Sequence, residues 1–229
     1  MKRIVKWSVA IVALTLIGYL VIFTIVDARL MGLATPNFDF SVDAEEYVIP
    51  KTTRIDSQTG YKCSAYSCAY LIRHQGQEMY GENVYDVMTD KMEGGYVYPK
   101  GIVKFLEFMD LSVEYHIGNL AALKNEVAKG NPVIVMIKIR PDRDWLHYVP
   151  VVGYTPDSVF IAESLPELCN AVSPFYNRSI STADFLELWN TSAFKMPLYR
   201  NTFISVTNNQ PIEDTGKENE AAHGVLPQN

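Results

Sequence analysis

The sequence has 229 residues, of which 48% are hydrophobic, and a formal net charge of −6. This length suits one domain of ordinary size with shorter appended segments, and the apolar fraction is sufficient to build a core. The first six residues hold three basic side chains and no acid, so the remainder of the chain carries −9. An acidic chain without a Lys/Arg cluster argues against a nucleic-acid partner.

The N-terminal segment has the pattern of a membrane anchor. Residues 7–26 are twenty consecutive residues without a charge, and at ~1.5 Å per residue such a helix spans roughly the 30 Å hydrocarbon core. Residues 1–6, which include three basic side chains, precede this segment, and Asp27 follows it. The positive-inside rule therefore predicts a single-pass signal anchor in the cell membrane, with residues 1–6 in the cytoplasm and the rest of the chain outside it. The alternative is a cleaved signal peptide, whose apolar region is usually shorter, at about 7–15 residues.

Two further segments differ in composition from a packed domain. Residues 27–49 carry scattered acids and no sustained apolar periodicity, which predicts a linker. Residues 208–229 are polar and charged, and such a segment cannot bury enough apolar surface to offset its ordering entropy. We therefore predict a disordered tail there and a folded domain over residues 50–207.

Helices are predicted first in that domain, over residues 64–76, 98–110 and 119–130. The first ends on a glycine, which is typical just past a helix C-terminus. The second has apolar side chains at the i, i+3, i+4 and i+7 spacing of an amphipathic helix. The third begins on a capping asparagine and stops at a glycine.

Strands are predicted to follow the helices. Runs rich in Val and Ile occupy residues 131–139, 147–155 and 158–164, and residues 199–207 form a closing strand. A capped helix is expected before it, over residues 181–190. Helices followed by strands indicate an α+β domain.

The three cysteines are Cys63, Cys68 and Cys169. Cys63 and Cys68 lie five residues apart on or beside one helix, point to different faces and are too distant for a disulfide. Their spacing matches no zinc pattern, and His74 would lie roughly 16 Å along the helix axis from Cys63. No phosphate-binding loop or ligand cluster is recognisable, so neither a metal nor a cofactor is expected.

Cys63 has the surroundings of a nucleophile. It lies where a loop gives way to a helix, and free amides with the positive end of the helix dipole favour a thiolate there. Gln58, five residues upstream, can offer its side-chain amide to an oxyanion. Cys68 is expected to be a small core residue. On these residues alone, a buried free cysteine remains an equal alternative for Cys63.

A family resemblance adds to this interpretation. The run "QTGYKCSAYSCAYLIRHQG", followed by "GNPVIVMIKI" and "WLHYVPVVGYTPDSVFIAES", resembles the bacterial papain-like cysteine peptidases that process double-glycine leader peptides in bacteriocin export, and their broader relatives. The resemblance covers residues 55–164. It implies a papain-like fold, with N-terminal helices packed on an antiparallel sheet. It also implies Gln58 as an oxyanion donor and Cys63 as the nucleophile. His147 would be the base, and Glu163 would orient the histidine.

The predicted strands support this placement. His147 opens one strand and Glu163 closes the next, and these two ends are neighbours in an antiparallel hairpin. A carboxylate could then hold one imidazole nitrogen while the other faces Cys63. Three positions depart from the family pattern: Ser64 stands where Gly is more frequent, and Glu163 and Ser164 stand where the family has Asp and Pro.

The sequence therefore predicts a membrane-anchored, extracytoplasmic thiol hydrolase that cleaves a peptide or amide bond of a peptide or protein substrate through an acyl-enzyme on Cys63. The alternative is a catalytically silent relative that binds peptides or cell-envelope material. A third possibility is acyl transfer to an amine by the same residues. The reactivity of the Cys63 thiol discriminates the binding module from the enzymes, because a binding module has no need of an activated thiol.

Overall fold

The structure is a computed structural model that describes residues 2–30, 32–51, 53–191 and 199–207. Its helices are α1 (Lys2–Leu30), α2 (Cys63–His74), α3 (Gly81–Val87), α4 (Pro99–Phe108), α5 (Leu120–Ala128), the 3-10 turn η1 (Pro166–Leu168) and α6 (Thr182–Trp189). Its strands are β1 (Thr35–Asn37), β2 (Tyr47–Val48), β3 (Ser112–Gly118), β4 (Val133–Arg140), β5 (Arg143–Tyr154), β6 (Ser158–Ile161), β7 (Arg178–Ser181) and β8 (Thr202–Thr207).

The strands form one sheet in the order β1-β3-β8-β4-β5-β6-β7, and β2 also pairs with β5. The β1–β3 pair is parallel and the other pairs are antiparallel. The long strand β5 therefore has β6 on one side, and β4 followed by β2 on the other, because β2 and β6 both pair with Gly153 and Tyr154. Ile161 at the end of β6 pairs with Val151, so His147, four residues earlier on β5, lies near Glu163, two residues beyond β6, as the hairpin argument predicts.

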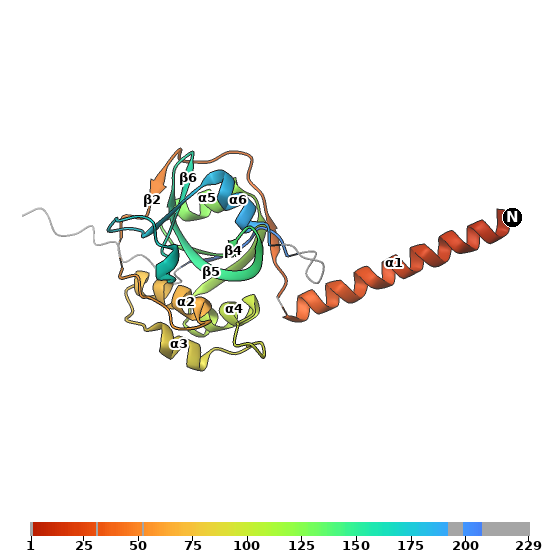
Figure 1. Cartoon of the computed structure of the whole chain (residues 1–229), viewed down its shortest axis with the longest axis horizontal. Helices are drawn as coiled ribbons and strands as arrows, with labels where there is room; N and C mark the ends of the chain where they lie inside the picture. The colour runs from red at the N-terminus through yellow and green to blue at the C-terminus, as the bar shows by residue number, and fades with distance from the viewer. Residues whose placement is uncertain (1, 31, 52, 192–198, 208–229) are drawn as a thin grey trace, which may run out of the picture.

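Helices lie on both faces of the sheet. Figure 1 shows α2, α3 and α4 grouped on one side, with α5 and α6 on the other. Helix α2 is fixed directly to β5, since the Ser67 hydroxyl donates to the backbone oxygen of Tyr148 at 3.0 Å. Every residue of α2 is buried, because α3 and α4 cover the surface that the sheet leaves.

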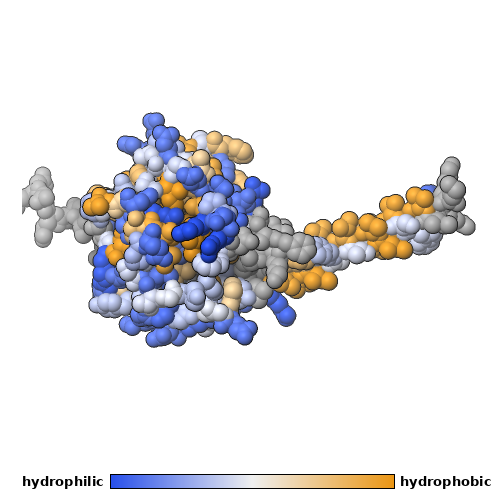
Figure 2. All heavy atoms as spheres, viewed as in Figure 1, coloured by the Kyte–Doolittle hydropathy of each residue, from blue (hydrophilic) through white to orange (hydrophobic). Residues whose placement is uncertain are grey.

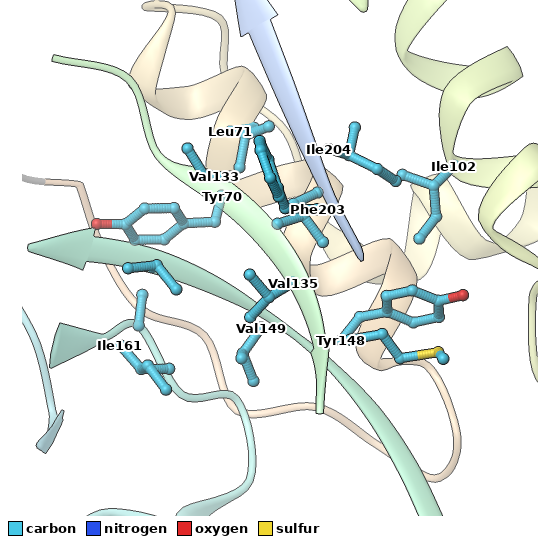
Figure 3. Close-up of a cluster of buried hydrophobic side chains, with 14 of the residues drawn as sticks. Tyr70, Leu71, Ile102, Val133, Val135, Tyr148, Val149, Ile161, Phe203 and Ile204 are labelled. Carbon is cyan, nitrogen blue, oxygen red and sulfur yellow. The ribbon is translucent and has the colours of Figure 1, made fainter. Parts of the chain in front are cut away.

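The core fills the space between these layers. Figure 3 shows Leu71 of α2 and Ile102 of α4 meeting side chains from β4, β5, β6 and β8, among them Val135 and Phe203. These side chains are almost entirely inaccessible to solvent. A nucleophile at the first residue of α2 is consequently built on a rigid element rather than on a free loop.

Most of the predicted elements are confirmed, with shifts at their ends. The capping residues act as expected: Asn119 Oδ1 accepts the amide of Ala122 at 3.0 Å, and Ser181 Oγ accepts that of Asp184 at 3.1 Å. Sequence patterns did not reveal α3, β3 or β7, which are short or lack a clean apolar period.

Helix α1 extends away from the domain (Figure 1), and its surface is apolar along most of its length (Figure 2). Within the described residues, one stretch is long and apolar enough to cross a membrane, Val5–Val26, with a mean hydropathy of 2.8 and no part of it buried in the protein. This length and composition fit a membrane span and also a signal sequence.

The segment predicted as a linker has structure at both ends. Residues 27–49 contain the last turn of α1 and the short strands β1 and β2. Asn125 fastens this segment to α5, since its Nδ2 donates to Asp39 Oδ2 at 2.9 Å and its Oδ1 accepts from the Asp43 amide at 2.9 Å. The predicted tail, residues 208–229, lies outside the described residues.

Candidate active site

Cys63 is the first residue of α2 and is 4% exposed. Gly60, with φ +57°, adopts the left-handed conformation that turns the chain into the helix. The N-cap residue, Lys62, makes no side-chain capping bond. The first amides of α2, including that of Cys63, are thus left without a side-chain acceptor at the helix N-terminus, where an anion is favoured.

His147 lies on β5 and joins the cysteine to a carboxylate. Its Nε2 is 2.7 Å from Glu163 Oε1, and its side chain is 1% exposed. The Cys63 thiol lies close enough to the His147 ring to raise the pKa of the imidazole. Since Nε2 faces the carboxylate, Nδ1 is the ring nitrogen left for the sulfur. The structure therefore brings Cys63, His147 and Glu163, three of the four predicted residues, together around the imidazole.

The two ionisable partners of His147 decide its protonation. Burial lowers the pKa of His147, but the hydrogen bonds and charges of Cys63 and Glu163 outweigh burial and raise this pKa to about 9. Burial likewise raises the pKa of the Glu163 carboxyl, yet the bond with His147, the Leu165 amide and the Arg178 charge together hold it below its usual range. An imidazolium beside a carboxylate is the favoured state at neutral pH.

Glu163 is held more tightly than the sequence suggested. Besides His147, its carboxylate accepts the amide of Leu165 at 2.8 Å and Nη1 of Arg178 at 2.8 Å. The Asn177 side chain pairs with the Glu163 backbone, accepting its N–H at 2.7 Å and donating to its C=O at 2.8 Å. These contacts fix a glutamate where the resemblance expects the shorter aspartate.

Asn177 and Arg178 were not predicted as site residues. Arg178 opens β7 and is paired with Ile161 of β6, two residues before Glu163. No periodic or spacing signal in the sequence marks β7, and only the order of strands in the sheet brings it beside Glu163.

Gln58 lies on the loop before α2, half-buried, and is bound to the residue after Glu163. The backbone N–H of Gln58 donates to the Ser164 backbone oxygen at 2.9 Å, and the Ser164 hydroxyl donates to the side-chain Oε1 of Gln58 at 2.7 Å. Its Nε2 donates one hydrogen to Gly60 O at 2.7 Å. An amide nitrogen carries two hydrogens, so a second donor remains for a substrate oxygen.

The other cysteines differ from Cys63. Cys68 is wholly buried in the core, and burial raises the pKa of its thiol far above the usual range. Cys169 is exposed as a residue. Partial burial of its sulfur and the nearby Glu163 charge nevertheless raise the pKa of its thiol. All three are free cysteines. Among the described residues, no group of three or more His, Cys, Asp or Glu side chains is arranged to hold a metal ion.

A match to a family model identifies the protein family of this chain. The model described as the Peptidase C39 like family matches residues 49–196, well over half of the chain. The chain belongs to the peptidase C39-like family. This confirms the resemblance seen in residues 55–164. No curated protein matches the sequence.

Solved structures agree with this membership of the C39-like family. One similar structure, from Bacillus anthracis, is assigned as a C39-like peptidase; it has 15% identity and a TM-score of 0.56, covering 73% of this chain and 100% of that one. The peptidase domain of Streptococcus ComA, a bi-functional ABC transporter involved in a quorum-sensing pathway, has 15% identity and a TM-score of 0.50, covering 67% and 96%. At such identities the likeness concerns the fold. The predicted α+β, papain-like fold is confirmed.

Proposed function

We propose that this C39-like protein is an active cysteine peptidase or related amide hydrolase, held outside the cytoplasm by α1. The observation that carries the proposal is the buried group of Cys63, His147 and Glu163, with 2.7 Å between His147 Nε2 and Glu163 Oε1. A nucleophile, a base and an orienting carboxylate in this order are the parts that thiol hydrolysis needs.

The chemistry follows from the positions of these groups. The Cys63 sulfur, its proton held by His147, attacks the carbonyl carbon of a peptide or amide bond. The resulting oxyanion accepts hydrogen bonds from the Cys63 backbone N–H and the remaining Gln58 Nε2 hydrogen. His147 gives its proton to the leaving nitrogen, and the amine departs to leave a thioester on Cys63. Water then attacks the thioester while His147 takes the water proton and returns it to the sulfur, which releases the carboxylic acid.

Peptide turnover tests the proposal directly. The full-length chain in detergent is incubated with a mixed-sequence peptide library, and new termini are identified by mass spectrometry. We expect cleavage by the wild type and none by Cys63→Ala. An added amine such as glycinamide separates the acyl-transfer alternative, because transfer gives amide products in place of free acids. A Cys63 that is unreactive to alkylation, with no cleavage by the wild type, would instead favour the silent binding module.

The membrane-anchored location is the second part of the proposal. The length and hydropathy of Val5–Val26 support it, as does the concentration of basic residues before this segment. Protease added to intact cells that produce the full chain should remove the domain and leave a short membrane-bound fragment. Protection of the domain until the membrane is opened would reverse the orientation, and release of a domain lacking α1 would indicate a cleaved signal peptide.

A further inference from the structure

We propose that Arg178 is a positioning residue of this site, which keeps Glu163 ionised and directed at His147; this inference rests on the proposed function. Arg178 Nη1 is 2.8 Å from Glu163 Oε2, and the exposed fractions of the two side chains are 8% and 0%. The opposite carboxylate oxygen, Oε1, faces His147 at 2.7 Å. One carboxylate thus joins a guanidinium on one side to an imidazole on the other.

The sheet explains why Arg178 can act in this way. It is the first residue of β7 and pairs with Ile161 at the end of β6. Asn177, directly before it, holds both backbone polar groups of Glu163 with its side-chain amide. Two consecutive residues therefore fix the backbone and the carboxylate of Glu163, which leaves the longer glutamate side chain little freedom to turn away from the ring.

The charges around Glu163 give Arg178 a role beyond packing. His147 faces the carboxylate from β5, Arg178 from β7, and the Cys169 thiol after η1 lies within its electrostatic reach. Cys63 lies beyond His147. With a thiolate on Cys63, the order is thiolate, imidazolium, carboxylate and guanidinium, which alternates in sign and sums to zero. Without Arg178 the buried group carries one unbalanced negative charge, which protonation of Glu163 would relieve.

Loss of the arginine should therefore change the pH dependence of Cys63. A protonated Glu163 supports the imidazolium less, and the missing cation also makes a thiolate less favourable. Both effects move the low-pH limb of Cys63 reactivity to higher pH. The effect reaches Cys63 through Glu163 and His147, which lie between Arg178 and the sulfur.

The test uses iodoacetamide as the probe, so that it requires no knowledge of the substrate. The alkylation rate of Cys63 is measured against pH by peptide mapping of the full-length chain in detergent. Arg178→Met should lower the rate severalfold at the acidic pH values where the wild-type rate is still rising with pH. Arg178→Lys keeps the positive charge, so its alkylation profile should lie close to the profile of the wild type. Arg178→Gln keeps a hydrogen-bond donor without the charge and replaces Arg178→Met in the test should the latter not fold.

Arg73→Met is the matched control. The Arg73 side chain is 4% exposed and pairs with a carboxylate, Asp56 at 3.1 Å, but at the opposite end of α2 from Cys63. Loss of this buried arginine should lower thermal stability and leave the pH dependence of Cys63 alkylation unchanged. A wild-type limb in every folded Arg178 variant would overturn the positioning role alone. Wild-type Cys63 no more reactive than a free cysteine would overturn the proposed function itself.

Discussion

The hydroxyl of Ser164 donates a hydrogen bond to Gln58 Oε1 at 2.7 Å, and the backbone oxygen of Ser164 accepts the Gln58 amide at 2.9 Å. Ser164 directly follows Glu163. The loop that carries the proposed oxyanion donor is thus fastened to the segment that carries the carboxylate. Because Oε1 is held by Ser164, the Gln58 side chain keeps its Nε2 on the other side, and the amide cannot flip without losing this bond.

The first prediction concerns this pair. Gln58→Ala should lower kcat about a hundredfold, the usual order for removal of one oxyanion donor. Ser164→Ala should lower kcat only about fivefold, because it removes one neutral hydrogen bond of roughly 1 kcal/mol and leaves the backbone bond intact. Steady-state kinetics on a peptide found by library cleavage measure both effects.

Ser57→Ala is the control for that comparison, since Ser57 is an exposed neighbour of Gln58 and should not affect kcat. A Ser164→Ala enzyme as impaired as Gln58→Ala would mean that Ser164 itself contacts the substrate. Full activity in Gln58→Ala would remove Gln58 from the mechanism.

The second prediction concerns the pH dependence of turnover. The pKa of His147 is raised to about 9, so the imidazolium persists through neutral pH and kcat/KM should fall as pH rises through about 9. Glu163→Gln removes one of the negative charges that raise this pKa. The alkaline limb should therefore move to lower pH, while His147→Ala should abolish turnover together with the limb.

Glu163→Gln should retain more activity than His147→Ala. The glutamine only loses support for the ring, whereas His147 must carry the proton to the leaving nitrogen. Rates measured across pH on the same peptide decide this ranking. An alkaline limb that stays in place in Glu163→Gln would show that the carboxylate does not govern His147.

The central part of this site was accessible from the sequence. Cys63 could be placed at the start of a helix because a polar loop gives way there to small and apolar residues, and the family resemblance implied its role as the nucleophile. The resemblance also implied the roles of His147 and Glu163, and two Val-rich strands with a short turn between them agreed with that pairing. These are local signals, in which residues close in the sequence determine the geometry.

The supporting contacts were not accessible, because they depend on which strand lies next to which. Arg178 reaches Glu163 only through the pairing of β6 with β7, and β7 is four residues long with no apolar period. Similarly, the paired residues of β1 and β3, such as Thr35 and His116, are 81 positions apart in the chain, so the sequence around β1 has the pattern of a linker. Pairings of this kind are determined by the whole fold and leave no mark on either segment.

The third prediction concerns Trp145, which is 57% exposed and lies under the guanidinium of Arg143 at 4.9 Å. It precedes His147 by two residues on β5, so both side chains project from the same face of the strand. An exposed aromatic ring beside the site is suited to contact a bound peptide. Trp145→Ala should raise KM about fivefold, as loss of roughly 1 kcal/mol of aromatic contact implies, with a smaller change in kcat.

Phe108→Ala serves as the control for Trp145, because Phe108 is 78% exposed at the end of α4. This substitution should leave both kinetic constants unchanged. A loss confined to kcat in Trp145→Ala would mean that the ring supports His147 rather than the substrate.

The last prediction ranks the three thiols. Iodoacetamide applied below neutral pH should label Cys63 first, because it lies at a helix N-terminus and next to the His147 ring. Cys169 should label mainly at alkaline pH, since burial and the Glu163 charge raise the pKa of its thiol. Cys68 should label only on unfolding, because it is wholly buried and its thiol pKa is raised further still.

Peptide mapping at several pH values, with a sample unfolded in denaturant as the reference for full access, measures this order. Cys68→Ala should keep its turnover while losing about 1 kcal/mol of stability, the order expected when a sulfur of methylene size leaves the core. Cys63→Ala should keep its stability and lose turnover entirely. Labelling of Cys169 ahead of Cys63 at low pH would contradict the assignment, because the most accessible thiol, rather than the one beside His147, would then be the reactive one.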